Sequence, residues 1–308
     1  MKPAAFDYTV PHTVAEAVDA LNDGRKAQVL AGGQSLLLEM HLERLRPDLV
    51  VDINRIPELD DMRVIDNTLH VGALVRHQVF ESAQAVPGPL GSLFARAVVN
   101  IAHPPIRSRG TMVGSFGWGH PASEWCAIAM ALDADIQLRS AQGARTVAAR
   151  DYFHGPLKTE RRPGELITSV RWPLLAEHTG VGFIEHRRTH FCFAQVAVAA
   201  ALTVQDGVIA EARIGLVNCA DRPLRAHAAE QTLTGAELGP PTDGYQLPET
   251  HPFARAGRIA AEQDADPAAE PYADLAYRRH AIAVVVARTL SQAANDHRSR
   301  VDESKGAR

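Results

Sequence analysis

Near the N-terminus, apolar residues change between helical spacing and short continuous runs. Residues 13–22 place their apolar side chains on one face of a helix, and Thr13 is a suitable N-cap. Residues 27–30 and 48–53 are short apolar runs typical of buried strands, and residues 36–45 between them return to helical spacing. The pattern predicts a small strand–helix–strand unit with glycines at the turn from strand to helix.

From about residue 58 to residue 175 the pattern changes. Residues 68–73, 136–139 and 166–171 alternate apolar and polar positions, as half-buried strands do. Residues 90–99 and 122–132 have the spacing of helices. These segments predict an α+β domain that Pro173 closes.

The C-terminal part predicts a second, smaller α+β unit. Residues 193–204 and 208–217, joined around Asp206 and Gly207, read as a β-hairpin. Six of the 19 prolines lie between residues 238 and 271, which predicts a long irregular connection. Residues 275–294 form the expected closing helix, and the charged tail 296–308 is expected to be disordered.

Composition narrows the functional classes. The 308 residues are 46% hydrophobic and 22% charged, as in an ordinary soluble globular protein, and the length suggests two domains. The net charge of −4 gives no broad basic field for nucleic acid. Apolar runs are much shorter than the roughly 20 residues of a membrane span, and the first residues show no signal-peptide pattern. We therefore expect a cytoplasmic protein without an integral membrane segment.

The cysteines and histidines predict neither a metal site nor a catalytic group. Cys126, Cys192 and Cys219 are far apart and odd in number, so they form no disulfide framework and cannot supply four thiolates to an iron–sulfur cluster. His186 and His190 have helical spacing but lack a third ligand, which favours an exposed basic segment. No catalytic residue is assigned.

The first candidate binding segment lies between the second predicted strand and the next helix. It consists of Ala31, Gly32, Gly33, Gln34 and Ser35. A glycine pair there lets the backbone adopt positive φ and approach a ligand. Successive N–H groups and the following helix can hold a phosphate or pyrophosphate, with the serine hydroxyl as a further donor. A tight turn that binds nothing is the alternative.

The second candidate is the glycine-rich stretch of residues 101–121. Four glycines fall within ten residues, mixed with Thr111 and Ser115. Loops of this kind bind ligands more often than they pack cores, which favours a binding loop over an exposed connection. Arg107 and Arg109 could reach phosphates, although single arginines more commonly form surface ion pairs.

Several motifs together resemble the FAD-binding medium subunit of the molybdenum hydroxylases, a family that includes the flavoprotein subunits of carbon monoxide dehydrogenase and the flavin domain of xanthine dehydrogenase. The resemblance spans nearly the whole chain and rests on residues 6–8 with Pro11, 31–36, 49–53, 103–111, 111–115, 163–167 and 277–280. It implies an α+β fold with a two-subdomain FAD-binding domain at 1–175 (about 1–57 and 58–175), a C-terminal flavoprotein domain at 176–295 and a tail at 296–308.

The resemblance also implies which residues bind FAD. Residues 31–35 would hold the pyrophosphate through backbone amides, and 111–115 would complete the cradle. Glu124 would lie near the ribityl chain, Leu166 and Ile167 near the adenine, and Phe193 near the isoalloxazine ring. The complete expected set is Val29, Leu30, Ala31, Gly32, Gly33, Gln34, Ser35, Leu36, His103, Ile106, Thr111, Gly114, Ser115, His120, Glu124, Leu166, Ile167 and Phe193.

Four positions depart from the family pattern. Val113 replaces the first glycine of the usual pair in the second loop, and a β-branched residue does not readily adopt positive φ. Trp118 replaces a common His, His120 a common Asp, and Cys192 a frequent Asp before Phe193.

By this resemblance the chain is an oxidoreductase subunit that carries FAD. It would take electrons from 2Fe–2S clusters on a small partner subunit and pass them to an acceptor, while a large partner subunit holds the molybdenum cofactor. A dimer of heterotrimers is expected. The alternatives are a stand-alone FAD-dependent oxidase or dehydrogenase, and a non-catalytic assembly subunit whose flavin site has decayed.

Overall fold

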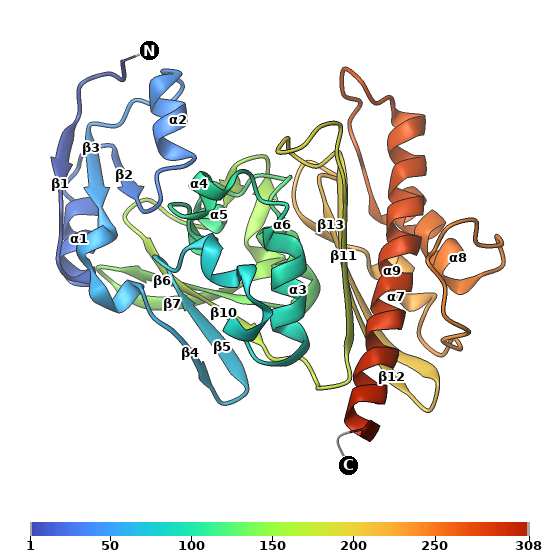
Figure 1. Cartoon of the computed structure of the whole chain (residues 1–308). Coiled ribbons are helices and arrows are strands. Elements are labelled where there is room, and N and C mark those ends of the chain that lie inside the picture. The colour runs from blue at the N-terminus through green and yellow to red at the C-terminus, as the bar shows by residue number, and fades with distance from the viewer. Residues whose placement is uncertain (1, 307–308) are drawn as a thin grey trace. The chain divides into compact units, whose positions relative to one another are not determined.

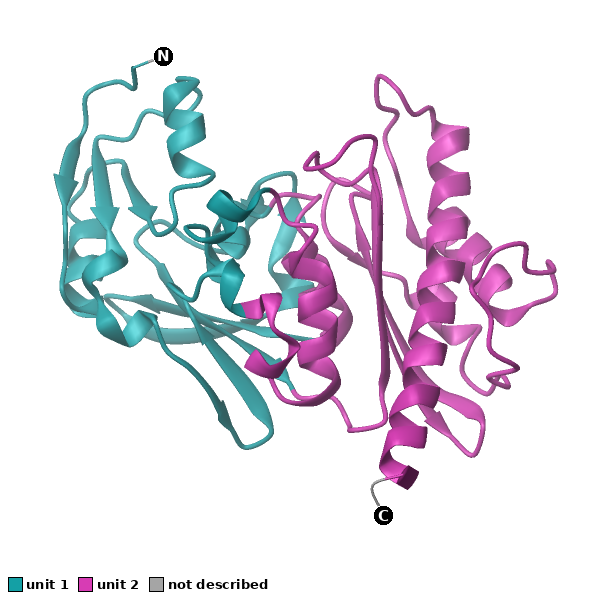
Figure 2. Ribbon diagram, in the orientation of Figure 1, with its two compact units in different colours: residues 1–79, 103–119, 133–173 teal, residues 80–102, 120–132, 174–308 magenta. Residues whose placement is uncertain are grey.

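The computed structural model describes residues 2–306, which form two compact units (Figure 2). Unit 1 takes in the chain up to Val79 together with His103–Gly119 and Asp133–Pro173. Unit 2 takes in Phe80–Ala102, His120–Leu132 and the chain from Leu174 onward. Two helical segments from the expected first domain thus group with unit 2, because their helices pack on the strands of its sheet. The bounds 1–175 and 176–295 stay a prediction.

The N-terminal part of unit 1 is a three-stranded parallel sheet (Figure 1). Its strands, in order, are β1 (Asp7–Thr9), β3 (Leu49–Asp52) and β2 (Ala27–Leu30), and its helices are α1 (Val14–Leu21) and α2 (Leu36–His41). The predicted strand–helix–strand unit is confirmed, with α2 ending earlier than expected. Thr13 caps α1, since its hydroxyl accepts from the Glu16 N–H at 3.1 Å.

The second sheet of unit 1 has five antiparallel strands. Their order is β4 (Met62–Ile65), β5 (Thr68–Gly72), β10 (Leu166–Pro173), β6 (Asp135–Ser140) and β7 (Gly143–Ala148). Alternation produces one buried face, on which Leu69, Val71 and Val170 are at most 1% exposed, and one polar face. Unit 1 also contains α4 (Pro104–Arg107), α5 (Met112–Trp118), β8 (Phe153–Gly155) and β9 (Lys158–Thr159).

Unit 2 is built on a four-stranded antiparallel sheet with helices on its faces. The strands, in order, are β11 (Gly180–His186), β12 (Val196–Gln205), β13 (Val208–Val217) and β14 (Leu224–Arg225). The helices are α3 (Gly88–Val98), α6 (Glu124–Leu132), α7 (His227–Gln231), α8 (Pro252–Ile259) and α9 (Leu275–Gly306). The predicted hairpin is confirmed as β12 and β13, although its first strand begins at Val196 rather than at residue 193.

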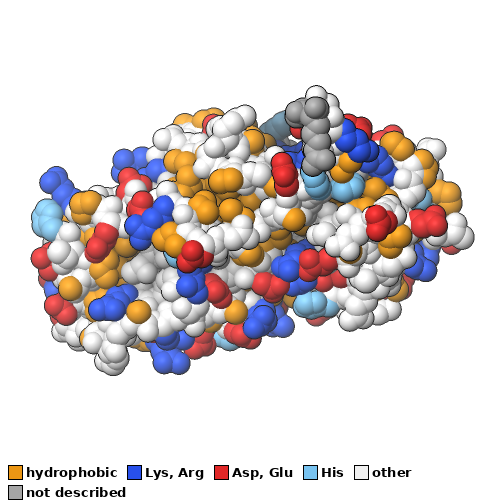
Figure 3. All heavy atoms as spheres, turned by 90° about the horizontal axis from the view of Figure 1, so that it is seen from below, with side chains coloured by type: hydrophobic (Ala, Val, Ile, Leu, Met, Phe, Trp, Pro, Cys, Tyr) orange, Lys and Arg blue, Asp and Glu red, His pale blue; other side chains and the backbone are white. Residues whose placement is uncertain are grey.

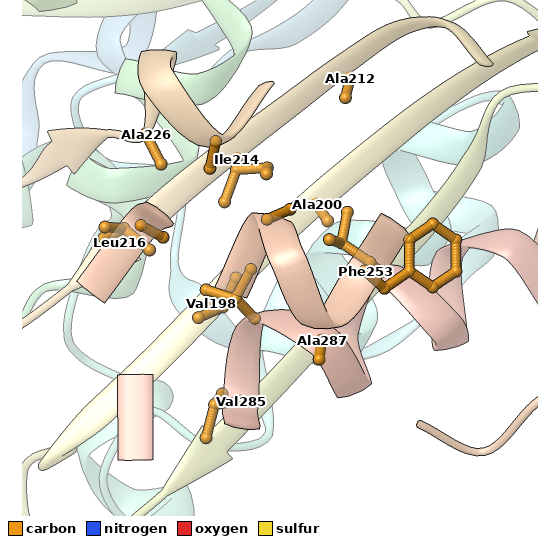
Figure 4. Close-up of a cluster of buried hydrophobic side chains, with 14 of the residues drawn as sticks. Val198, Ala200, Ala212, Ile214, Leu216, Ala226, Phe253, Val285 and Ala287 are labelled. Carbon is orange, nitrogen blue, oxygen red and sulfur yellow. The ribbon is translucent and has the colours of Figure 1, made fainter. Parts of the chain in front are cut away.

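The core of unit 2 lies between this sheet and the C-terminal helices. Val198 and Ala200 of β12 and Ile214 of β13 face Phe253 of α8 and Val285 of α9 (Figure 4). These side chains are at most 4% exposed, so the apolar alternation along the hairpin is used to bury one face.

Two expectations for the C-terminal part were wrong. The proline-rich connection contains α8, where Pro252 occupies the first turn and Phe253 is buried, followed by a π-helical turn at Ala260–Asp264. The charged tail is not disordered over its described length, because α9 continues to Gly306. Asp296 explains the continuation: its side chain is 9% exposed and pairs with Arg96 and, at 2.7 Å, with Arg300.

Charges of both signs are interspersed on the face drawn in Figure 3. Within residues 2–306, no helix has an apolar stretch long enough to cross a membrane.

Unit 2 buries two carboxyl groups that interact electrostatically. Burial, followed by the charge of Glu185, raises the pKa of Glu124 to about 8. Burial also raises the pKa of Glu185 to about 7, against the opposing effect of Arg187, whose Nη1 lies 3.5 Å from Oε1. Neither carboxyl oxygen of Glu185 has a hydrogen-bond partner among the residues that the structure describes. The folded state therefore favours protonated carboxyls here.

We expect the free energy of unfolding to fall as the pH rises toward and past 8. Because the folded pKa of Glu124 is raised to about 8, the native state binds more protons than the unfolded state, and its stabilisation is lost as that proton leaves. Glu124→Gln should flatten the decline by about 1 kcal/mol per pH unit between pH 6.5 and 8. Urea unfolding at several pH values measures this.

Glu249→Gln is the matched control, because the Glu249 side chain is 94% exposed. It should keep the wild-type pH dependence. Equal slopes in wild type and Glu124→Gln would contradict the assignment of a buried, protonated Glu124.

Candidate functional site

A cleft in unit 1 collects most of the expected binding residues. It is lined by the segment from β2 into α2, by the first turns of α5 and by the start of β10. The expected residues that line it are Val29, Ala31, Gly32, Gly33, Gln34, Ser35, Leu36, Thr111, Gly114, Ser115, Leu166 and Ile167. The structure thus brings together two glycine segments that are far apart in sequence.

The two glycine segments touch through their backbones. A Cβ built on Gly32 would lie 2.6 Å from Gly110 Cα and closer still to the Arg109 carbonyl oxygen, so only glycine fits at this position. Gly33 has φ +74°, a left-handed conformation that side chains make unfavourable. The turn after β2 therefore needs glycine twice, once for close approach and once for its backbone conformation.

The side chains of Asn54 and Arg76 link the two glycine segments by hydrogen bonds. The Asn54 amide donates to the Ala31 carbonyl at 2.9 Å and accepts from Arg76 Nη2 at 2.6 Å. Arg76 Nη1 donates to the Arg109 carbonyl oxygen. Each glycine segment is thus hydrogen-bonded to one member of a pair of side chains that also bond to each other. Neither residue was expected from the sequence, because only the fold brings them beside the glycine segments.

Asp52 orients Asn54 in turn. Its Oδ1 accepts from the Asn54 backbone N–H at 2.9 Å, and its other oxygen accepts from the Tyr8 hydroxyl. Burial acts to raise the pKa of Asp52, but these hydrogen bonds outweigh it and keep the pKa below its ordinary value. The carboxylate therefore stays ionised and holds Asn54 in place.

The second glycine segment is the first turn of a helix rather than a loop. Thr111 is the N-cap of α5, and its hydroxyl accepts from the Gly114 N–H at 2.9 Å. Val113 lies within the helix and is not among the residues with positive φ, so its departure from the family pattern causes no backbone strain. A Cβ on Gly114 would lie 2.8 Å from the Thr111 hydroxyl oxygen.

His77 and Arg161 set the electrostatics of the cleft, and neither was expected from the sequence. Burial, with the charges of Arg107 and Arg76, lowers the pKa of His77 to about 3, so its imidazole is neutral. Glu165 is held by Arg145 through contacts of 2.6 and 2.8 Å. Among residues 2–306, no carboxylate is paired with Arg161, which also lines the cleft. The Arg161 guanidinium donates to the Glu165 carbonyl at 3.1 Å.

Three expected residues of unit 1 do not line the cleft. The Leu30 side chain packs beside Gly33. The carbonyl of His103 accepts from the Ile106 N–H at 2.9 Å, and the carbonyl of Ile106 accepts from the Gly110 N–H at 2.7 Å. His103 and Ile106 therefore hold the turn that precedes Gly110. They support the second glycine segment through their backbones and do not line the cleft.

The remaining expected residues belong to unit 2. The rings of His120 and Phe193 stack with centroids 4.5 Å apart and planes inclined by 12°, and Phe193 is 67% exposed. Burial lowers the pKa of His120. Glu124 is buried in the same unit. The flavin contacts expected of these three residues stay predictions.

Within residues 2–306, no group of three or more His, Cys, Asp or Glu side chains is arranged to hold a metal ion. Cys126 and Cys219 are buried, and burial raises the pKa of each thiol to about 12, which makes both unreactive. Cys192 is exposed.

Comparisons with known proteins identify the family of the chain. Residues 4–175 match the family described as FAD binding domain in molybdopterin dehydrogenase, and residues 183–293 match the CO dehydrogenase flavoprotein C-terminal domain. The chain is 34% identical over 302 residues to the 6-hydroxypseudooxynicotine dehydrogenase complex subunit alpha of Paenarthrobacter nicotinovorans, covering 97% of each chain.

Carbon monoxide dehydrogenase from Hydrogenophaga pseudoflava is similar in both sequence and structure. Its medium chain is 32% identical over 294 residues, covering 95% of this chain and 98% of the relative. The solved structure of that enzyme lacking the Mo-pyranopterin moiety of its cofactor aligns with a TM-score of 0.88 at 32% identity, covering 97% of this chain and 99% of the other. The chain therefore belongs to the FAD-binding medium subunits of the molybdenum hydroxylases, FAD-dependent oxidoreductases that include the carbon monoxide dehydrogenase and xanthine dehydrogenase flavoproteins.

Proposed function

We propose that this chain is the electron-transfer subunit of a heteromeric molybdenum hydroxylase. It would work with a large subunit that holds the molybdenum cofactor and a small subunit that holds 2Fe–2S clusters, as a dimer of heterotrimers. FAD, when bound, supplies the capacity to collect two electrons from one-electron clusters and to release them to an acceptor. With three cysteines, this chain cannot itself provide the four thiolates of a cluster.

The observation that carries the proposal is the side-chain-free cradle where Gly32 meets Arg109 and Gly110. A Cβ at Gly32 would collide with that backbone, so the residues present fit a ligand that is held by main-chain groups at close range. A pyrophosphate is such a ligand, because backbone N–H groups at a glycine turn and at a helix start favour negative charge.

In this proposal, different residues of the cleft bind different parts of FAD. Gly32 and Gly33 open the backbone for the pyrophosphate, and Ser35, whose side chain does not cap α2, offers a hydroxyl. Arg161 adds the positive charge that an anionic cofactor needs, while the neutral His77 adds none. Leu166 and Ile167 offer an apolar wall for the adenine.

In unit 2, the stacked pair of His120 and Phe193 offers an exposed aromatic surface suited to the isoalloxazine ring. The reading of a decayed flavin site loses its argument from Val113, since this residue occupies an ordinary helical position.

The cradle can be tested through Gly32→Ala and Gly33→Ala. The first change pushes the two glycine segments apart, and the second strains a residue at φ +74°, so each should weaken FAD binding by about tenfold or more. Quenching of flavin fluorescence measures the affinity. Gly24→Ala is the control, because Gly24 has φ +89° but no neighbouring atom within 4 Å of an added Cβ. Unchanged FAD affinity in both cradle variants would mean that residues 31–35 form only a tight turn and do not bind the cofactor.

The first turn of α5 gives a second test. Gly114→Ala places a methyl group against the Thr111 hydroxyl, so we expect it to disturb the cap and lower FAD affinity. Val113→Gly should keep FAD affinity but cost about 2–4 kcal/mol of stability, because the Val113 side chain is only 3% exposed and its removal leaves a cavity. Side-by-side affinity and urea-unfolding measurements compare them. The opposite order of effects on affinity would show that the residues of this turn are wrongly assigned.

The electron-transfer role is tested with the FAD-loaded chain on its own. Under anaerobic conditions, a panel of carbon monoxide, N-heterocycles and aldehydes should leave the flavin absorbance unchanged, because the hydroxylation site would lie on the large subunit. Adding the molybdenum and iron–sulfur subunits should allow the productive substrate to bleach it. Dithionite provides the control, since it should bleach the flavin in both samples. Reduction of the isolated chain by a substrate would favour the stand-alone oxidase or dehydrogenase.

A further inference from the structure

The stacked rings of His120 and Phe193 lie on segments of unit 2 that are far apart in sequence. His120 belongs to the turn before α6, and Phe193 belongs to the connection between β11 and β12. Residues 188–193 of that connection are all exposed, so burial does not hold them in place. The contact of two rings is too weak to order an exposed segment by itself. The stacked arrangement therefore depends on backbone anchors close to each ring.

Asn218 provides an anchor for both segments. It directly follows β13, and its backbone N–H donates at 2.9 Å to the carbonyl of Pro121, the residue after His120. Its side-chain amide donates at 2.8 Å to the carbonyl of Ala194, the residue after Phe193. One residue thus holds the chain immediately after each of the two rings.

The backbone of Asn218 explains why asparagine suits this position. Its φ is +55°, a left-handed value that asparagine tolerates better than most side chains do. Glycine would accept the same conformation but offers no side-chain donor. The position therefore uses both properties of asparagine, and a change to glycine removes only the donor.

Arg278 of α9 supports Asn218 through its guanidinium, which is buried with the rest of a side chain that is 3% exposed. Nη2 donates to the Asn218 carbonyl and, at 2.9 Å, to the Gln195 carbonyl. Nη1 donates to the Ala268 carbonyl at 2.7 Å. Arg278 belongs to residues 277–280, which carry part of the family resemblance but do not line the cleft of unit 1. These contacts give that segment a role near the stacked rings.

Glu270 joins Asn218 and Arg278 to each other. Its Oε1 accepts from Asn218 Nδ2 at 3.0 Å and lies 3.0 Å from Arg278 Nη1. The two hydrogens of the Asn218 amide thus have acceptors in Ala194 and Glu270, which fixes the orientation of the amide. The carboxylate also compensates the charge of the buried arginine.

We propose that Asn218, supported by Arg278 and Glu270, is a positioning residue that holds the rings of His120 and Phe193 in their stacked arrangement for the isoalloxazine ring. The inference rests on the proposed function for the identity of that ligand. Asn218 acts through the backbone of the two segments, because its hydrogen bonds end on carbonyl groups next to the rings.

Asn218→Gly tests this role in the full chain before FAD is added. Glycine keeps the backbone conformation and the bond to Pro121 but loses the bond to Ala194. The NMR signals of the His120 ring protons report stacking, because a neighbouring aromatic ring shifts them. His120→Gln identifies the signals, and Phe193→Ala gives their unstacked position. We expect Asn218→Gly to move them most of the way to that position.

Asp206→Gly is the matched control, because Asp206 has φ +51° in the turn at the opposite end of the β12–β13 hairpin. It should leave the His120 signals in their wild-type position. Asn218→Asp is a second variant that keeps the size of the side chain, but its carboxylate cannot donate to Ala194, so the signals should move as in Asn218→Gly. Unmoved signals in either Asn218 variant, or an equal shift in Asp206→Gly, overturn the positioning role.

Calorimetric titrations with FAD and with ADP separate this role from the proposed function. ADP lacks the isoalloxazine ring, so Asn218→Gly should bind ADP as the wild type does. It should bind FAD about fivefold more weakly, as expected for the loss of one aromatic contact. Unchanged FAD affinity, or equal losses for FAD and ADP, overturns the role toward the isoalloxazine ring.

Phe193→Ala distinguishes a failure of the proposed function. If this variant binds FAD as tightly as the wild type, the proposed place of the isoalloxazine ring is wrong. The His120 signals of the Asn218 variants, recorded without FAD, still decide whether Asn218 orders the stacked pair.

Discussion

The contact between Gly32 and the backbone of Arg109 and Gly110 is the constraint on which the main cleft of unit 1 depends. Any side chain at Gly32 would collide with that backbone, so the two segments can meet only as main chain against main chain. Asn54 donates to a carbonyl of the first segment, and Arg76 donates to a carbonyl of the second segment and to Asn54. These hydrogen bonds hold the two segments together.

Electrostatics in unit 1 follow from which charges are already paired. Asp52 and Glu165 are ionised and hydrogen-bonded to protein groups, so they are engaged before a ligand arrives. His77 is kept neutral by burial and by neighbouring arginines. Arg161 therefore lines the cleft as a cation with no paired carboxylate among the described residues.

Unit 2 differs from unit 1 in how it accommodates buried acidic side chains. Its sheet and helices α8 and α9 enclose an apolar core, but Glu124 and Glu185 are also buried. The Arg187 charge, with its Nη1 3.5 Å from Glu185 Oε1, does not outweigh the effect of burial on the pKa of Glu185, unlike the hydrogen-bonded arginine that holds Glu165 in unit 1. Protonation is then the least costly way to bury them. This makes the stability of the unit sensitive to pH near neutrality, in a direction opposite to that of an ion-paired carboxylate.

Local patterns in the sequence determined those features that depend on neighbouring residues. The cap at Thr13, the hairpin around Asp206 and Gly207, and the two glycine segments were all predicted, because caps, turns and alternation are short-range properties. The tertiary structure alone decided features that join distant residues. Asp296 extends α9 through its pair with Arg96, 200 positions away in sequence, and no local signal reports that partner. Asn54, Arg76 and Arg161 were missed for the same reason: a polar side chain acquires its role from what the fold places beside it.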